Sequence, residues 1–154
     1  MSLRDVCARL SKDGSPKILL IHTPKETVVQ ELNLVKAEAR HRSFIISTWV
    51  KSYEAQARKQ GIGREYAEAE PAIAESRWED CIVATDDDGY TVYGWVCGSR
   101  NGGMLWHAYV IPELRRLRVA TRLIEYACGE LNYYARPWPF MSHARVNPYL
   151  LCKK

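Results

Sequence analysis

The fold is decided by residues 81–130, CIVATDDDGYTVYGWVCGSRNGGMLWHAYVIPELRRLRVATRLIEYACGE. Turn-forming residues, Asp88-Gly89 and Asn101-Gly102-Gly103, divide its first part into three β-type runs. These runs are residues 81–85, 90–97 and 104–111. Apolar residues then recur at helical spacing within residues 118–130. The stretch therefore predicts an antiparallel meander of three strands that leads into an amphipathic helix.

Two more helices are predicted before this meander. Residues 43–61 carry one apolar stripe at four-residue spacing, formed by Ile45, Trp49 and Tyr53. Gly61-Ile62-Gly63 ends that helix. Residues 64–78 have helical composition, but they contain Pro71, so the second helix must restart or kink there.

Toward both ends of the chain the patterns are less regular. Residues 17–22, KILLIH, predict a short strand, and Thr23-Pro24-Lys25-Glu26 has the spacing of a helix cap with proline at the first helical position. Residues 28–36 fit either a continuation of that helix or a strand. Residues 131–143 have extended character, interrupted by two prolines.

The length and composition predict one globular domain. A chain of 154 residues fits a single domain, 1–154, in which we treat residues 1–30 as an N-terminal extension. No run approaches the roughly 18 apolar residues of a membrane helix. Residues 1–17 alternate charged and small residues where a secretory signal needs a continuous apolar run. We therefore expect no membrane partner and a cytoplasmic protein, or one of the host cytoplasm if it is viral.

The cysteines do not form a recognisable pattern of disulfides or metal ligands. Five are present, and they are widely spread: Cys7, Cys81, Cys97, Cys128 and Cys152. They include no C-x-x-C pair, and no histidine lies nearby at metal-ligand spacing or as the partner of a nucleophile. We expect reduced thiols that mostly pack in the core, and no metal site.

Charge is distributed unevenly, although the net charge of +4 is small. Nine of the 18 acidic residues lie within residues 65–88. Basic residues gather instead at Arg115, Arg116, Arg118 and Arg122, and again at Lys153 and Lys154. This asymmetry predicts that one part of the molecule faces an anion, either a nucleotide or a nucleic acid.

The arginine-rich segment lies in a turn that has the features of an anion site. Residues 109–127, YVIPELRRLRVATRLIEYA, run from an apolar strand through a proline and a short turn into a helix. The first turn of a helix presents N–H groups without intrahelical partners at the positive end of the dipole. Such a turn can hold a pyrophosphate, and arginines add charge to it.

The same segment resembles the acyl-CoA-binding motif of the GNAT superfamily of N-acetyltransferases. The motif reads strand-Val-x-Pro-x-x-Gln/Arg-x-x-Gly-x-Gly/Ala-Ser/Thr, followed by a helix. The matching residues here are Val110, Pro112, Arg115, Ala120 and Thr121. The resemblance extends over roughly residues 49–140 and implies an α/β (α+β) fold: a mixed, mostly antiparallel central sheet flanked by helices, abbreviated at the C-terminus. The helix FIISTWVKSY and the helix after it also look like those of short acetyltransferase-like proteins from bacteriophages.

The resemblance implies an acetyl-CoA-dependent N-acetyltransferase in which a primary amine attacks the thioester directly. The backbone of Val110 and Ile111 would then pair with the pantetheine arm, and an amide near Ile111 would polarise the acyl carbonyl. Backbone amides of the turn would wrap the pyrophosphate. These belong to Arg116, Leu117, Arg118, Val119, Ala120 and Thr121, with Arg115 at the position of the motif's Gln/Arg.

Arg118 is the one clear departure, because the motif has glycine there. Glycine usually stands where backbone must approach a phosphate closely or adopt positive φ. An arginine fits if its conformation is helical, and its guanidinium could then contact phosphate. The substitution leaves two interpretations, an altered CoA site or a lost one.

Candidates for acid and base catalysis are few. The strand position where many family members have a glutamate is Met104. His107 either acts as a base through a water or is a packed core residue. Tyr149 either protonates the CoA sulfur, as the resemblance implies, or is an aromatic that holds the C-terminus. His143 is a further candidate, with a surface or strand-end position as its alternative.

The acceptor and the class of protein stay open. The acidic run favours a cationic amine, such as a protein lysine, a protein N-terminus or a polyamine, but a solvated helix end at Glu79 and Asp80 is the simpler account. A rival hypothesis is a catalytically silent GNAT-like protein that binds a host or partner macromolecule. Either protein could form a dimer. A nucleic-acid-binding module fits less well with the small net charge. Aromatic residues that could stack on bases fit core packing better: Trp78, Trp95, Trp106, Trp138, Tyr133 and Tyr134.

Overall fold

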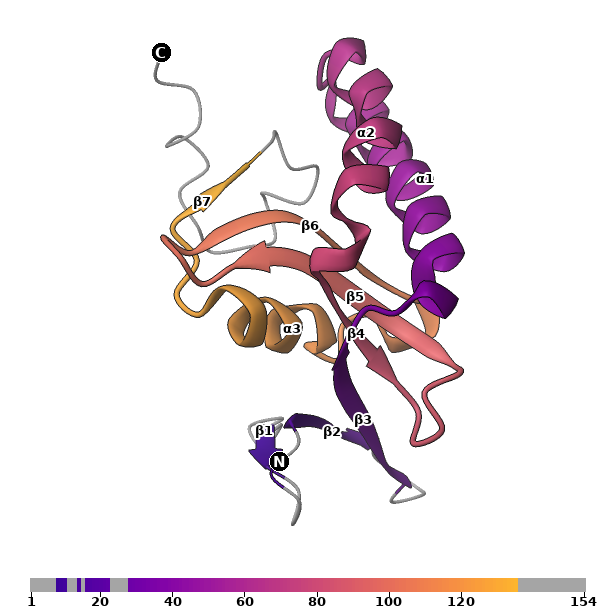
Figure 1. Ribbon diagram of the computed structural model, residues 1–154, viewed down its shortest axis with the longest axis vertical. Coiled ribbons are helices and arrows are strands. Elements are labelled where there is room, and N and C mark those ends of the chain that lie inside the picture. Colours follow the sequence, from indigo (N-terminus) through magenta and orange to yellow (C-terminus); the bar gives the residue numbers. More distant parts are fainter. Residues whose placement is uncertain (1–7, 11–13, 15, 23–27, 136–154) are drawn as a thin grey trace.

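The computed structural model describes residues 8–10, 14, 16–22 and 28–135 (Figure 1). Within these residues one sheet holds seven strands. They are β1 (Ala8–Leu10), β2 (Pro16–His22), β3 (Val28–Lys36), β4 (Cys81–Thr85), β5 (Val92–Ser99), β6 (Met104–Val110) and β7 (Tyr133–Tyr134). The α-helices of the same part are α1 (Arg42–Gln60), α2 (Arg64–Arg77) and α3 (Val119–Cys128). Single 3-10 turns stand at η1 (Ala39–His41), η2 (Trp78–Asp80) and η3 (Pro112–Leu114).

The strands lie in the sheet in the order in which they occur in the chain. Each pairs with the next in antiparallel fashion, except β6 and β7, which are parallel. Parallel neighbours need a crossover connection, and α3 supplies it. The helices α1 and α2 cover one face of the sheet and α3 covers the other (Figure 1). The expected mixed, mostly antiparallel sheet flanked by helices is therefore confirmed.

Alternation along the strands divides the apolar residues between two cores. On the α3 side, Val96 and Leu105 pack with buried residues of the helix such as Leu123. On the α1 and α2 side, Trp49 stacks on Trp95 with ring centroids 5.0 Å apart. The central strands β4, β5 and β6 are thus buried on both faces, which explains their nearly continuous apolar character.

A β-bulge in β6 changes the phase of this alternation. Cys97 pairs with His107, but the next residue of β5, Gly98, pairs with Leu105, so Trp106 is left as the extra residue. Leu105 faces the α3 core, whereas His107, two residues further, contacts Trp49 and Trp95 in the other core. Without the bulge, residues two apart would point to the same face.

The predicted meander is confirmed, with boundaries shifted by one or two residues. The second strand ends at Ser99 rather than at residue 97, and the third ends at Val110 rather than at residue 111. The second strand begins at Val92 rather than at Tyr90. The Asp86 carboxylate accepts hydrogen bonds from the backbone amides of Tyr90 and Thr91, at 3.0 and 3.2 Å. Those amides are therefore used within the turn instead of the sheet.

The structure also tests the secondary structure predicted for the segments before the meander. Residues 28–36, left open between helix and strand, form β3, and residues 17–22 lie in β2 as predicted. The helix that begins near Ser43 ends at Gly61, whose φ of 69° is left-handed. Of the two expectations at Pro71, a restart or a kink, the restart is wrong, since α2 continues through this exposed residue. Residues 23–26, and most of residues 131–143, lie outside the described residues.

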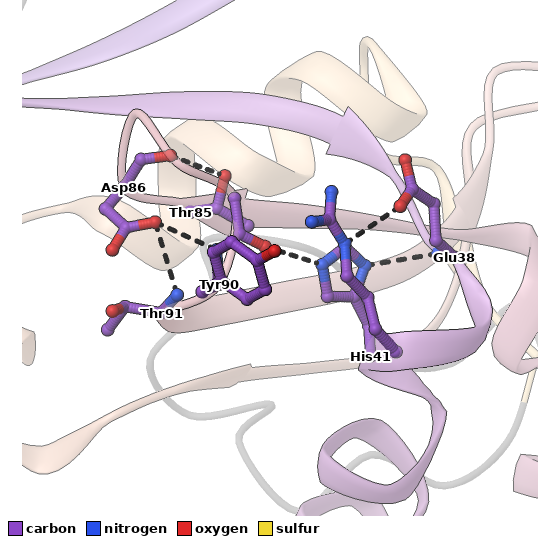
Figure 2. Close-up of polar contacts among 8 residues, drawn as sticks. Glu38, His41, Thr85, Asp86, Tyr90 and Thr91 are labelled. Carbon is purple, nitrogen blue, oxygen red and sulfur yellow. Dashed lines mark hydrogen bonds and ion pairs between the residues drawn. The ribbon is translucent and has the colours of Figure 1, made fainter.

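A buried histidine joins the start of α1 to the turn between β4 and β5 (Figure 2). His41 is 1% exposed, and its Nδ1 accepts a hydrogen bond from the Glu38 backbone amide at 3.1 Å. The ring proton therefore lies on Nε2, which donates to the Gly89 carbonyl at 3.1 Å. Above this contact, the Arg40 guanidinium pairs with Glu38 at 2.8 Å and lies over the Tyr90 ring.

We expect His41→Ala to lower the free energy of unfolding by roughly 2–3 kcal/mol, because it removes a buried ring and leaves the partly buried Glu38 amide and Gly89 carbonyl without partners. Urea unfolding followed by tryptophan fluorescence measures the loss. Arg40→Ala is the matched control: its ion pair and ring contact are exposed, so it should cost less than about 1 kcal/mol. Equal losses for the two variants would contradict the role of the His41 contacts.

Candidate functional site

The turn between β6 and α3 has an unusual backbone. After Val110 the chain forms η3, and Arg115 then adopts an extended conformation with φ −67° and ψ 153°. Arg116 and Arg118 follow at φ values of 66° and 62°. Within the described residues these two arginines are the non-glycine residues with positive φ. The condition for accommodating Arg118, a helical conformation, is not met: the residue adopts the left-handed conformation that favours glycine.

The amides of this turn lack acceptors among the described residues. Leu114 N–H and Arg115 N–H donate within η3, and the next backbone bond is from Arg122 N–H to the Arg118 carbonyl at 3.0 Å. No bond to a described acceptor is found for the amides of residues 116–121, and no side chain caps α3. A left-handed residue at the start of a helix directs neighbouring N–H groups into one concavity, which is the geometry of an anion site.

The arginine side chains divide into two groups. Arg116 and Arg118 are exposed beside the free amides. Arg122 pairs with Glu125 at 3.0 Å on α3. Arg115 folds back onto the strand: its Nε donates to the Val110 carbonyl at 3.1 Å, and its guanidinium lies 5.8 Å from the centre of the Tyr109 ring. The positive charge nearest the amides therefore comes from Arg116 and Arg118.

The end of β6 departs from the expected pairing with a pantetheine arm. Ile111 N–H donates to the Tyr93 carbonyl at 3.0 Å, so this amide is used inside the sheet and faces β5. Successive residues of a strand direct their peptide groups to opposite edges, so those of Val110 face away from β5. Of the two residues assigned to the arm, Val110 lies on the outer edge and Ile111 does not.

His107 lies in the core between the sheet and α1. Its side chain is 0% exposed and contacts the rings of Trp49, Tyr53 and Trp95. The Ser52 hydroxyl lies 2.9 Å from Nε2. Burial lowers the pKa of His107 to about 3, so the ring is uncharged near neutral pH and is a weak proton acceptor. These surroundings match the alternative of a packed core residue.

The other described residues that the sequence analysis considered for the functional site do not lie together in the structure. Met104 begins β6, where its carbonyl accepts from the Cys128 thiol at 3.2 Å. Cys81, Cys97 and Cys128 are free, buried thiols, and burial raises the pKa of Cys128 to about 11. Trp95 is buried, while Arg77 lies over the ring of Trp106. Tyr149 and His143 lie outside the described residues.

Several residues of the acidic run form ion pairs or hydrogen bonds, two of them at helical spacing in the chain and others with a distant element. Ion pairs join Glu68 to Arg64, Glu75 to Arg42 and Asp80 to Arg77. Glu70 is buried in α2 and accepts from the Trp49 indole N–H at 2.7 Å. Hydrogen bonds from the Thr91 side chain and from nearby amides lower the pKa of Asp86. Three of the nine acidic residues of the run are thereby paired with arginines.

Two open hollows lie away from the turn. The larger, about 580 Å³, is lined by Asp80, Ser99, Arg100 and Tyr126 among others. The smaller, about 360 Å³, lies beside the acidic turn and is lined by residues that include Lys17, Asn33 and Asp87. Neither contains a residue of 115–121. The candidate site is therefore defined by its backbone amides and arginines rather than by a deep cavity.

No protein-family model, curated protein or solved structure matches this chain. Within the described residues, no helix combines the length and the apolar character needed to cross a membrane.

We expect the free energy of unfolding to fall through His107 as the pH drops from about 6.5 toward 3, with a slope that rises to at most about 1.4 kcal/mol per pH unit. The unfolded chain takes up this proton below about 6.5 while the folded protein does not, so acid favours unfolding. Urea unfolding at pH 7, 6 and 5 measures the slope. His107→Gln should have a correspondingly shallower slope, and identical slopes would contradict the prediction.

We expect Arg118→Gly to raise the free energy of unfolding by up to about 1 kcal/mol, because glycine relieves the left-handed strain. Arg122→Gly is the matched control in the same segment, since Arg122 is helical and glycine there should cost about 1 kcal/mol. Thermal and urea unfolding compare the two variants. A loss of stability in both would show that position 118 does not favour glycine.

Proposed function

We propose that this protein binds an acyl-CoA donor, acetyl-CoA in the first instance, at the turn between β6 and α3 and transfers the acyl group to a primary amine. The observation that carries the proposal is the left-handed conformation of Arg118, at the position where the resembled GNAT motif has glycine. The backbone of residues 116–121 thus has the shape that the motif's glycine permits, although the side chain differs.

The physical chemistry of the turn supports a pyrophosphate ligand. Its amides precede and begin a helix, where the dipole favours negative charge. Arg116 and Arg118 are exposed on the same turn, and a guanidinium can bind a phosphate through two parallel hydrogen bonds. Left-handed arginines cost stability, and such strain is concentrated at functional sites.

The topology supports the same location. β6 and β7 are parallel neighbours connected through α3, and the turn follows the carboxyl end of β6. In sheets with parallel strands, ligands bind beyond the carboxyl ends, where a helix begins.

The proposed reaction is direct attack of an uncharged amine on the thioester carbonyl. The N–C bond forms, the C–S bond breaks, and the proton lost by the amine is balanced by one taken up by the thiolate. Among the described residues His107 is buried and too weakly basic to remove that proton efficiently. We propose that water accepts the proton and that Tyr149 remains the candidate donor to sulfur.

A second candidate function is a GNAT-like binding protein without transferase activity. Two observations favour it: Met104 stands where a catalytic glutamate is expected, and His107 is enclosed in the core. This protein would hold a partner macromolecule through the same basic turn.

Isothermal titration calorimetry with acetyl-CoA tests the proposal. We expect binding in the micromolar range, abolished by Ala120→Trp because Ala120 is half-buried at the first turn of α3 and an indole there would crowd the neighbouring amides. Ser99→Trp is the matched control: it blocks the larger hollow lined by Ser99 and should leave binding unchanged. The opposite pattern would place the donor in that hollow, and no heat with the wild-type protein would refute the proposal.

An acetyl-transfer assay with amine acceptors separates the two functions. Release of CoA thiol that depends on the acceptor supports a transferase, whereas binding of acetyl-CoA without release supports the silent form.

A further inference from the structure

The outer edge of β6 is covered unevenly among the described residues. At its start, β7 pairs with Met104 and Leu105, and Ala135 N–H donates to the Leu105 carbonyl at 2.8 Å. At its end, the Val110 carbonyl faces the same outer edge, because the amide of the next residue, Ile111, faces β5. This carbonyl is where a ligand with an amide could join the sheet as an added strand.

The Arg115 side chain already donates a hydrogen bond to that carbonyl. Its Nε lies 3.1 Å from the Val110 oxygen, and its guanidinium lies over the Tyr109 ring at 5.8 Å. Two contacts of different kinds thus hold the side chain against the end of the strand. A cation folded back on its own strand is turned away from the anion turn that begins at the next residue.

We propose that Arg115 is a latch on the acyl-CoA site, closed over the Val110 carbonyl until the amide-containing arm of the donor displaces it. This inference rests on the proposed function and adds regulation to the same site. The arm of CoA contains amide N–H groups, and each needs a carbonyl acceptor when it lies along a strand edge. Displacement frees the guanidinium, which can then turn toward the anionic half of the donor.

NMR titration with the two halves of the donor tests the latch. S-acetylpantetheine carries the arm without any phosphate, and adenosine 3′,5′-bisphosphate carries phosphates without the arm. Arg115→Met removes the hydrogen-bond donor and keeps an apolar side chain against Tyr109. We expect this variant to bind S-acetylpantetheine about three- to tenfold more tightly than the wild type, the effect of one hydrogen bond no longer broken. Arg58→Met, an exposed arginine of α1, should bind it as the wild type does.

A second measurement uses the wild-type protein, so it does not depend on the variant's folding. The Arg115 Nε–H resonance should exchange slowly with solvent in the free protein and faster when S-acetylpantetheine is added. If the exchange rate of the Arg115 Nε–H were unchanged at a saturating concentration of S-acetylpantetheine, the latch proposal would be overturned. An affinity of Arg115→Met for the arm equal to or below that of the wild type would overturn it as well.

The failure of the latch and the failure of the proposed function give different results. Suppose that acetyl-CoA and the bisphosphate bind both the wild type and Arg115→Met, but that the variant binds S-acetylpantetheine no more tightly than the wild type. The latch alone is then wrong. If acetyl-CoA, the bisphosphate and the arm all leave the wild-type spectrum unchanged, the proposed function is wrong and the latch with it.

Discussion

Strand β6 contributes to two cores, and the bulge at Trp106 decides which of its side chains face which core. Before the bulge, Leu105 packs toward α3; after it, His107 and Tyr109 contact the layer of α1 and α2, while Val110 returns to the α3 core. The strand therefore leaves the sheet with the Val110 peptide on its outer edge and the Ile111 amide bonded to β5. The bulge therefore sets which edge of β6 the peptide groups of Val110 and Ile111 face, directly before the turn.

The turn that leaves β6 is strained but is anchored on both sides. Leu114 before it and Val119 after it are buried in the same core, so the chain must reverse direction within a few residues. Left-handed conformations at Arg116 and Arg118 are the local cost of that reversal, and burial of apolar side chains offsets it. Neither arginine is used in the core, which leaves both guanidinium groups at the surface beside the amides.

Local patterns accounted for much of the fold and for the location of the candidate site. Glycine and aspartate turns marked the meander, apolar spacing marked α1 and α3, and the motif departure at Arg118 marked one of the two arginines with positive φ. Local patterns missed contacts made between distant elements. The indole of Trp49 reaches Glu70 in α2, and His41 reaches the Gly89 carbonyl; no spacing in the chain relates these partners.

The sequence by itself determined the strands, the helices and an arginine-rich turn before a helix, because these depend on residues close together in the chain. Only the tertiary structure decided which groups are available for chemistry. Pairing with β5 engages the Ile111 amide, the bulge turns His107 toward the core on the α1 and α2 side, and Arg42 of α1 pairs with Glu75 of the acidic run. Hydrogen bonding, burial and charge pairing depend on what another part of the chain brings near, so local periodicity does not contain them.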